Sequence, residues 1–194
     1  VGSEMCIRDR HKVASYPYGG YWEDIGTIRS FFDANIALTD AIPEFNLFDD
    51  DSVIYTRPRL LAPSKIFGTW FNKAVIAEGC IIHAKKIERS IIGIRSRIGA
   101  DTEISNAIIM GNDSYETLEE MEKLGKTPKR GIGDECEIRN AIIDKDVRIG
   151  NNVVIHGSVA LNDTETETHC IRDGIIEVKK GAIIPNGTRI GLGA

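Results

Sequence analysis

Two arginines on either side of one proline form the most suggestive polar group in this sequence. They are Arg57 and Arg59, flanking Pro58. Proline favours an extended backbone in the residue before it, and side chains two residues apart on an extended chain point to the same side. Two guanidinium groups on one side suit a phosphate or a carboxylate, which they bind through paired hydrogen bonds. The alternative is a pair of solvated arginines on a linker.

A single aspartate, Asp24, could contribute to a site for a hard metal ion. Mg²⁺ prefers carboxylate oxygens and commonly shares them with a phosphate group. Spacing alone favours another role, in which Asp24 caps a turn just before a helix that begins at Thr27. Beside it, Tyr21 and Trp22 are either packing residues or one wall of a substrate site, and Glu23 is interpreted as a solvated neighbour.

The histidines and cysteines do not suggest a metal centre. A zinc site built from three imidazoles needs them suitably placed, and the sequence shows no such arrangement. The cysteines are widely spaced with no CxxC pair, so we expect reduced thiols in a cytosol-like compartment. The histidines are His11, His83, His156 and His169, and the cysteines are Cys6, Cys80, Cys136 and Cys170.

The composition is that of an ordinary soluble protein of one substantial or two small domains. Apolar residues make up 42% and charged residues 27% of the 194 residues, and the formal net charge is −5. An acidic chain is a poor general ligand for nucleic acid or anionic membranes, and no apolar run approaches the roughly 20 residues of a membrane span. Any anion site must therefore be a local basic cluster.

Isoleucines recur in three series with a period of 17 residues, or 34 where one member is skipped. Within a period the steps are six, six and five residues, which suits a short strand and a tight corner better than an α-helix. Three such sides make one coil of a parallel β-helix, with each series stacked as an inward column. Each buried isoleucine contributes roughly 1.5–3 kcal/mol. The columns are Val75, Ile92, Ile109 and Ile143; Ile81, Ile98, Ile132 and Ile149; and Ile87, Ile104, Ile138 and Ile155.

Two insertions interrupt the predicted coils. Residues 111–130 include Ser114 as a candidate helix cap and Gly125 as a stop, which predicts a short helix or loop. Residues 161–172 are polar, after which the pattern resumes at Val178, Ile184 and Ile190. Glycine follows several column residues and is expected to relax the corner backbone. These glycines are Gly93, Gly99, Gly133 and Gly150.

The segment before the coils differs in pattern. Thr27 can cap a helix from Ile28 to about Leu38, and residues 51–74 are predicted to be a linker. Residues 1–10 do not join obviously to the rest of the chain, and we interpret them as an artefactual leader outside the fold. The coils then occupy residues 75–194.

Four stretches in a fixed order carry a family resemblance. They are GYWEDIGT (20–27), YTRPRLLAPSK (55–65), AIIDKDVRIGNNV (141–153) and DGIIEVKKGAIIPNGT (173–188). Together they resemble the carboxyl-terminal part of the glucose-1-phosphate adenylyltransferases, or ADP-glucose pyrophosphorylases. The resemblance implies a mainly β fold, a left-handed parallel β-helix used for regulation and oligomerisation. It also implies that residues 11–50 are a short α/β remnant of the nucleotidyltransferase catalytic domain.

The resemblance implies a chemistry that this stretch of chain only partly contains. The family makes ADP-glucose and diphosphate from ATP and α-D-glucose 1-phosphate with Mg²⁺, for glycogen or starch synthesis. By motif, Asp24 matches the Mg²⁺ ligand, and Tyr21 and Trp22 lie near the substrate. The glycine-rich nucleotide loop that the reaction needs is not in this sequence, so we expect this chain alone to be inactive.

The resemblance also implies allosteric control by phosphate-bearing anions. Family members are activated by compounds such as 3-phosphoglycerate or fructose 1,6-bisphosphate and inhibited by phosphate or AMP. By motif, Lys145 and Lys180 would bind these anions together with Arg57 and Arg59. Asp144 is expected to orient Lys145, and Arg172 is a weaker candidate. The family forms homo- or hetero-tetramers in the cytoplasm or the plastid stroma.

Two other functions stay open. A hexapeptide-repeat acyltransferase using acyl-CoA would need a histidine as general base, and His156 follows a column residue, which places it outward or at a corner. Acyl-CoA binding would identify that function. A non-catalytic oligomerisation scaffold is the other, and the mass in solution with a titration of phosphate analogues would separate it from an effector-binding domain.

Overall fold

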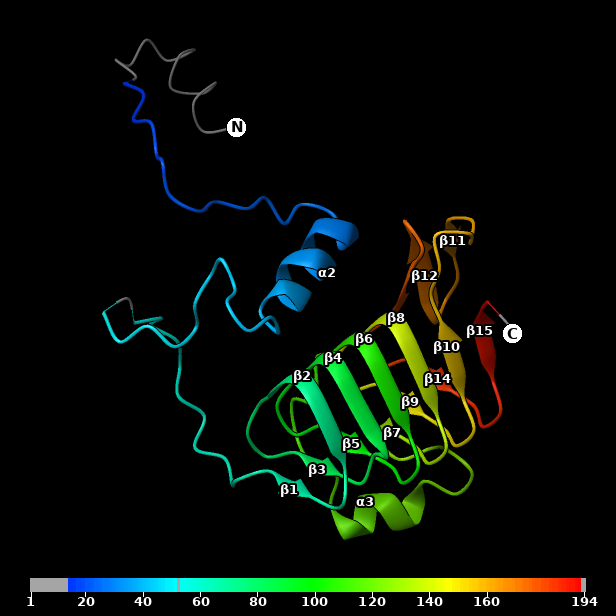
Figure 1. Ribbon diagram of the computed structural model, residues 1–194. Coiled ribbons are helices and arrows are strands. Elements are labelled where there is room, and N and C mark those ends of the chain that lie inside the picture. The colour runs from blue at the N-terminus through cyan, green and yellow to red at the C-terminus, as the bar shows by residue number, and fades with distance from the viewer. Residues whose placement is uncertain (1–13, 52, 193–194) are drawn as a thin grey trace, which may run out of the picture.

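The computed structural model describes residues 14–51 and 53–192 (Figure 1). The predicted leader, which includes Cys6, and the nearby His11 lie outside the described residues. The helices are α2 (Ile28–Ala37) and α3 (Leu118–Lys123). The strands are β1 (Lys65–Ile66), β2 (Trp70–Ile76), β3 (Ile81–Ile82), β4 (Lys86–Ile92), β5 (Arg97–Ile98), β6 (Glu103–Ile109), β7 (Gly131–Ile132), β8 (Glu137–Ile143), β9 (Arg148–Ile149), β10 (Val154–His156), β11 (Thr164–Glu165), β12 (His169–Arg172), β13 (Ile175–Val178), β14 (Ile183–Ile184) and β15 (Arg189–Gly191).

The strands stack in parallel as a three-sided coil. One side is the ladder β1-β3-β5-β7-β9-β14. The other two sides are formed by the long strands β2, β4, β6 and β8, each of which runs along both sides. Each of these strands bends between the two sides at one residue with a left-handed backbone, such as Asn106 (φ 48°) in β6 and Asn140 (φ 49°) in β8. The first half of β8 pairs with β10 and its second half with β13. The predicted parallel β-helix is confirmed.

The isoleucine columns form its core. Ile87, Ile104, Ile138 and Ile155 lie in register and have no exposed side-chain surface. After the second insertion the predicted register also holds, since Val178 pairs with Ile143, Ile184 with Ile149 and Ile190 with Ile155. The period of the sequence therefore predicts the inside of the coil.

The first coil corrects two column positions. Ile76 and Ile82, not Val75 and Ile81, pair with the column residues Ile92 and Ile98. The reason is a shorter connection, because three residues join β3 to β4 whereas four join β5 to β6. One missing residue in the connection displaces the register of everything before it.

The corner glycines are needed for a different reason from the one predicted. Gly93, Gly99, Gly133 and Gly150 are not in the left-handed region, whereas the non-glycine corner residues Asp101 (φ 56°) and Asp146 (φ 60°) are. A Cβ at Gly133 would overlap the backbone of Gly150 in the next coil. These glycines permit a close approach between coils and do not relax a turn.

The helix predicted from Ile28 forms, the first insertion contains a short helix, and one predicted cap is wrong. Thr27 caps α2, accepting a hydrogen bond from the Ser30 N–H at 3.0 Å. In α3 the cap is Thr117, not Ser114, because Thr117 and Glu120 satisfy each other's backbone N–H groups in a capping box. The second insertion folds into antiparallel pairings of β11, β12 and β13.

The segment before residue 75 is attached to the coil. Phe32 and Ile36 of α2 are buried against Ile108, Ile142 and Ile175, which face outward from the columns. Strand β1 and most of β2 lie in the range predicted as a linker. They pair with β3 and β4 and so form part of the first coil. The linker prediction is therefore wrong from Lys65 onward.

Candidate anion-binding corner

Two lysines lie on adjacent coils at one corner of the β-helix. Lys145 and Lys180 each follow by two residues a column residue, Ile143 and Val178, and these two column residues are partners in the parallel ladder. Equivalent positions of neighbouring coils lie about 4.8 Å apart. The fold therefore places two ammonium groups next to each other, an arrangement that an anion nearby would stabilise.

That anion is the carboxylate of Asp113. Its Oδ1 accepts a hydrogen bond from Lys145 Nζ at 2.8 Å and its Oδ2 one from Lys180 Nζ at 3.0 Å. The two lysines hold the pKa of Asp113 well below its usual range, and Asp113 raises the pKa of Lys180. The Asp113 backbone N–H donates to Asp146 at 3.0 Å, which fixes the start of the first insertion at this corner.

Sequence reasoning missed Asp113. The available signal was its position four residues after the column residue Ile109, which pairs with Ile143 and so shares the corner with Lys145. The insertion hid this signal, because Asp113 and Lys145 are 32 positions apart in the sequence, which is more than one coil period.

The predicted arginine pair faces the same corner. Arg57 and Arg59 line an open cavity of about 500 Å³ together with Arg95 and Asp113. Arg95 also lies over the ring of Tyr115, with 5.6 Å between the guanidinium carbon and the ring centre. Four of the predicted anion-binding residues thus lie at this corner, two of them bonded to Asp113 and two lining the cavity with it. They are Arg57, Arg59, Lys145 and Lys180.

Asp144 and Arg172 have other partners. The Asp144 carboxylate accepts from the backbone N–H of Lys145 at 2.6 Å, whereas Asp113 holds the lysine ammonium group. Arg172 donates to Glu165 at 2.7 Å and to the Thr164 carbonyl at 3.0 Å. Its guanidinium is engaged in the β11–β12 hairpin and does not line the cavity of Arg57 and Arg59.

The predicted metal ligand lies before α2, in a local turn. Asp24 is exposed, and its Oδ1 accepts from the Gly26 N–H at 3.2 Å. Tyr21 stacks on Phe45 with ring centres 6.5 Å apart, and Trp22 is 73% exposed. Across residues 14–51 and 53–192, no group of three or more His, Cys, Asp or Glu side chains could hold a metal ion.

The remaining candidate groups make local contacts or are buried. The His156 Nε2 lies 3.3 Å from Glu137 Oε2, and the His83 ring stacks on Phe67 with 4.1 Å between ring centres. Cys80, Cys136 and Cys170 are free and buried, and burial raises the pKa of each thiol. In the described part of the chain, no helix is both long and apolar enough to span a membrane.

The fold and this corner define a class: parallel β-helix domains, here with basic side chains gathered where successive coils turn. Residues 59–189 match the family model described as the GLGC left-handed parallel beta-helix domain, and the chain belongs to that family. The chain is 42% identical, over 196 aligned residues, to the protein named glucose-1-phosphate adenylyltransferase large subunit 1, chloroplastic/amyloplastic, of Zea mays. That alignment covers 97% of this chain and 38% of the maize protein.

Proposed function

We propose that this chain is the effector-binding and assembly part of a glucose-1-phosphate adenylyltransferase. The family match over residues 59–189 and the name of the maize relative support this proposal. The observation that supports the regulatory role is that Lys145 and Lys180 bind Asp113, while Arg57 and Arg59 line a cavity that Asp113 also lines. An exposed cluster with this excess of cations is suited to a phosphate-bearing anion such as 3-phosphoglycerate, fructose 1,6-bisphosphate, inorganic phosphate or AMP.

In this proposal Asp113 holds the site in the absence of an effector. A carboxylate between two ammonium groups occupies the place that a phosphate oxygen would take, and each ammonium has further hydrogens to donate. The Asp113 side chain is 46% exposed, so it can move aside when a stronger anion arrives. Arg57 and Arg59 lie on the chain that leads into β1, so an anion there would link this segment to the coils.

The longer protein would make ADP-glucose and diphosphate from ATP and α-D-glucose 1-phosphate. In that reaction Asp24 would supply one carboxylate to Mg²⁺, with Tyr21 and Trp22 beside the sugar phosphate. The bound metal would neutralise charge on the transferring phosphoryl group. Since no group of three or more possible ligands gathers among the described residues, Mg²⁺ binding is proposed only for the longer protein.

Assembly into a homo- or hetero-tetramer is proposed for the outer edges of the coil. Strand β2 lies at the end of its sheet and carries Trp70, which is 51% exposed. Such an open edge is normally covered by another element or chain. A mass measurement in solution tests this role, and a monomer at working concentration would contradict it. We propose the cytoplasm or the plastid stroma as its location.

The regulatory proposal is tested in the longer enzyme with Lys145→Ala and Lys180→Ala. Each variant is expected to raise the activator concentration for half-saturation by about tenfold, because each loses a charge-assisted hydrogen bond. Lys123→Ala is the matched control, since Lys123 lies at the end of α3 and outside the corner. An unchanged half-saturation in both corner variants would contradict the proposed effector site.

A further inference from the structure

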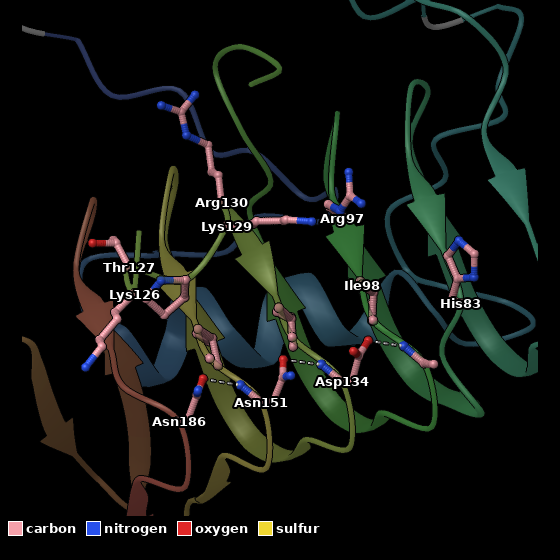
Figure 2. A pocket seen from close by; sticks show the side chains of 17 residues that line it. His83, Arg97, Ile98, Lys126, Thr127, Lys129, Arg130, Asp134, Asn151 and Asn186 are labelled. Atoms are coloured by element: carbon pink, nitrogen blue, oxygen red, sulfur yellow. Dashed lines mark hydrogen bonds between the residues drawn. The ribbon is translucent and has the colours of Figure 1, made fainter. Parts of the chain in front are cut away.

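A second basic groove lies on a different side of the coil from Asp113. It has a volume of about 450 Å³ and lies between the end of the first insertion, residues 126–130, and the corner that follows β5, β7 and β9. Figure 2 shows this groove with its lining side chains. Its size is in the usual range for sites that bind small molecules.

The floor of the groove is a ladder of corner side chains. Asp134 Oδ1 accepts from the Ala100 N–H at 2.8 Å, Asn151 Oδ1 from the Asp134 N–H at 3.0 Å, and Asn186 Oδ1 from the Asn151 N–H at 2.9 Å (Figure 2). Because a backbone N–H needs an acceptor, each asparagine must turn its oxygen to the backbone. The Nδ2 groups of Asn151 and Asn186 are then left to donate, and neither has a partner among the described residues.

The walls of the groove supply positive charge. Arg97, Lys126 and Lys129 line it, and none of the three forms an ion pair within residues 14–51 and 53–192. In Figure 2 the Lys129 side chain extends from the insertion toward Arg97 on β5. Asp134 is the one carboxylate in the lining, and one of its oxygens is already used by the backbone. Two cations that face each other repel, and an anion between them would remove that repulsion.

The segment that carries these lysines, residues 126–130, is held against the coil by hydrogen bonds and an ion pair. Arg148 donates to the Pro128 carbonyl at 2.9 Å and pairs with Glu116 at 2.5 Å, where the two side chains are only 17% and 5% exposed. Arg130 donates to Ser114 Oγ at 2.8 Å. These contacts fix the loop at Pro128 and Arg130, on either side of Lys129, so the groove is formed before any ligand binds.

We propose that this groove is a second binding site, distinct from the Asp113 corner, for a phosphorylated polyhydroxyl compound such as a sugar phosphate. The phosphate lies between Arg97 and Lys129, which supply charge-assisted donors. The hydroxyl groups lie over the ladder, where Asn151 and Asn186 donate and the second oxygen of Asp134 accepts. The proposed ligand carries both a phosphate and hydroxyl groups, because the groove offers cations on its walls and amide groups on its floor.

The test is a calorimetric titration of glucose 6-phosphate into the 194-residue protein with Lys145→Ala and Lys180→Ala already in place. This background removes the two lysines that hold Asp113, and Arg57 and Arg59 stay in place in every arm. A loss of binding between arms is therefore assigned to the groove and not to the proposed effector site. Binding of one glucose 6-phosphate is expected to persist there, and adding Arg97→Ala with Lys129→Ala is expected to weaken it at least tenfold. Adding Lys123→Ala instead, on α3 and outside the groove, is expected to leave it unchanged.

Two further arms separate the parts of the ligand. Asn186→Asp keeps the oxygen that accepts from Asn151 but replaces the donor, so glucose 6-phosphate should bind several-fold more weakly. Inorganic phosphate and glucose, titrated separately, should each bind more weakly than glucose 6-phosphate. The proposal is overturned if the background protein fails to bind glucose 6-phosphate, or if Arg97→Ala with Lys129→Ala leaves that binding intact.

Discussion

The inside of the coil and its Asp113 corner obey different rules. Inside, identical side chains repeat, and residues such as Ile104 and Ile138 are completely buried by the same side chains of neighbouring coils. At the corner, Asp113, Lys145 and Lys180 are partly exposed, differ from coil to coil, and meet across an insertion. The comparison teaches that the repeat provides stability, whereas departures from the repeat provide the candidate chemistry.

The largest expected effect comes from a cavity inside the coil. Ile104→Ala should lower the free energy of unfolding by about 2–5 kcal/mol, since the lost contacts leave a void between adjacent coils. Ile183→Ala is the matched control, because Ile183 is 47% exposed, and its cost should stay below about 1 kcal/mol. Urea denaturation followed by circular dichroism measures both. Equal losses of unfolding free energy in the two variants would contradict the proposed difference between the buried columns and exposed positions.

A methyl group between coils should have the next largest effect. Gly133→Ala places a Cβ against the backbone of Gly150, so we expect a loss of about 1–3 kcal/mol from overpacking. Gly19→Ala is the control, since nothing lies within 4 Å of its added Cβ. The same denaturation experiment applies. A stable Gly133→Ala protein would show that the coils can separate at this corner without cost.

Removing both corner lysines should hardly change stability. Exposed ion pairs contribute about 0–1 kcal/mol each, so Lys145→Ala with Lys180→Ala should unfold within about 2 kcal/mol of the original protein. A larger loss would mean that the corner is part of the folding core and would weaken the division between core and site.

The smallest effect concerns pH. The pKa of Asp113 is lowered in the folded state by Lys145 and Lys180, so its contribution to stability is complete above the ordinary aspartate pKa of about 3.9. This contribution declines as pH falls below that value, and it is lost as pH falls through the lowered pKa of the folded state. The stability difference from Asp113→Asn should therefore be constant between about pH 5 and 8 and shrink in acid. A difference that grows in acid would contradict the assignment.

Most of the coil could be predicted because its signal is periodic and local. The columns from Ile87 onward follow the 17-residue spacing in the sequence, and burial of isoleucine leaves few other arrangements. The register error at Val75 and Ile81 arose from one missing residue between β3 and β4. The 17-residue spacing alone does not show where one residue is missing, because the described residues contain no earlier coil with which the first column positions could be compared.

The corner was predicted only in part, because its partners come from outside the period. The family resemblance indicated Lys145 and Lys180, and the proline between Arg57 and Arg59 marked a paired donor. The signal for Asp113, its position after the column residue Ile109, was hidden because the insertion separates it from both lysines. The groove of Arg97 and Lys129 was missed for the same reason, as it forms where the insertion returns to the coil.

Equilibrium titration of 3-phosphoglycerate into the 194-residue protein tests the central claim most directly. The original protein is expected to bind it, Asp113→Asn to bind it several-fold more tightly because the competing carboxylate is gone, and Lys145→Ala with Lys180→Ala to bind it at least about tenfold more weakly. Binding that is unchanged by loss of both lysines, or weaker in Asp113→Asn, would contradict the assignment of this corner as the anion site.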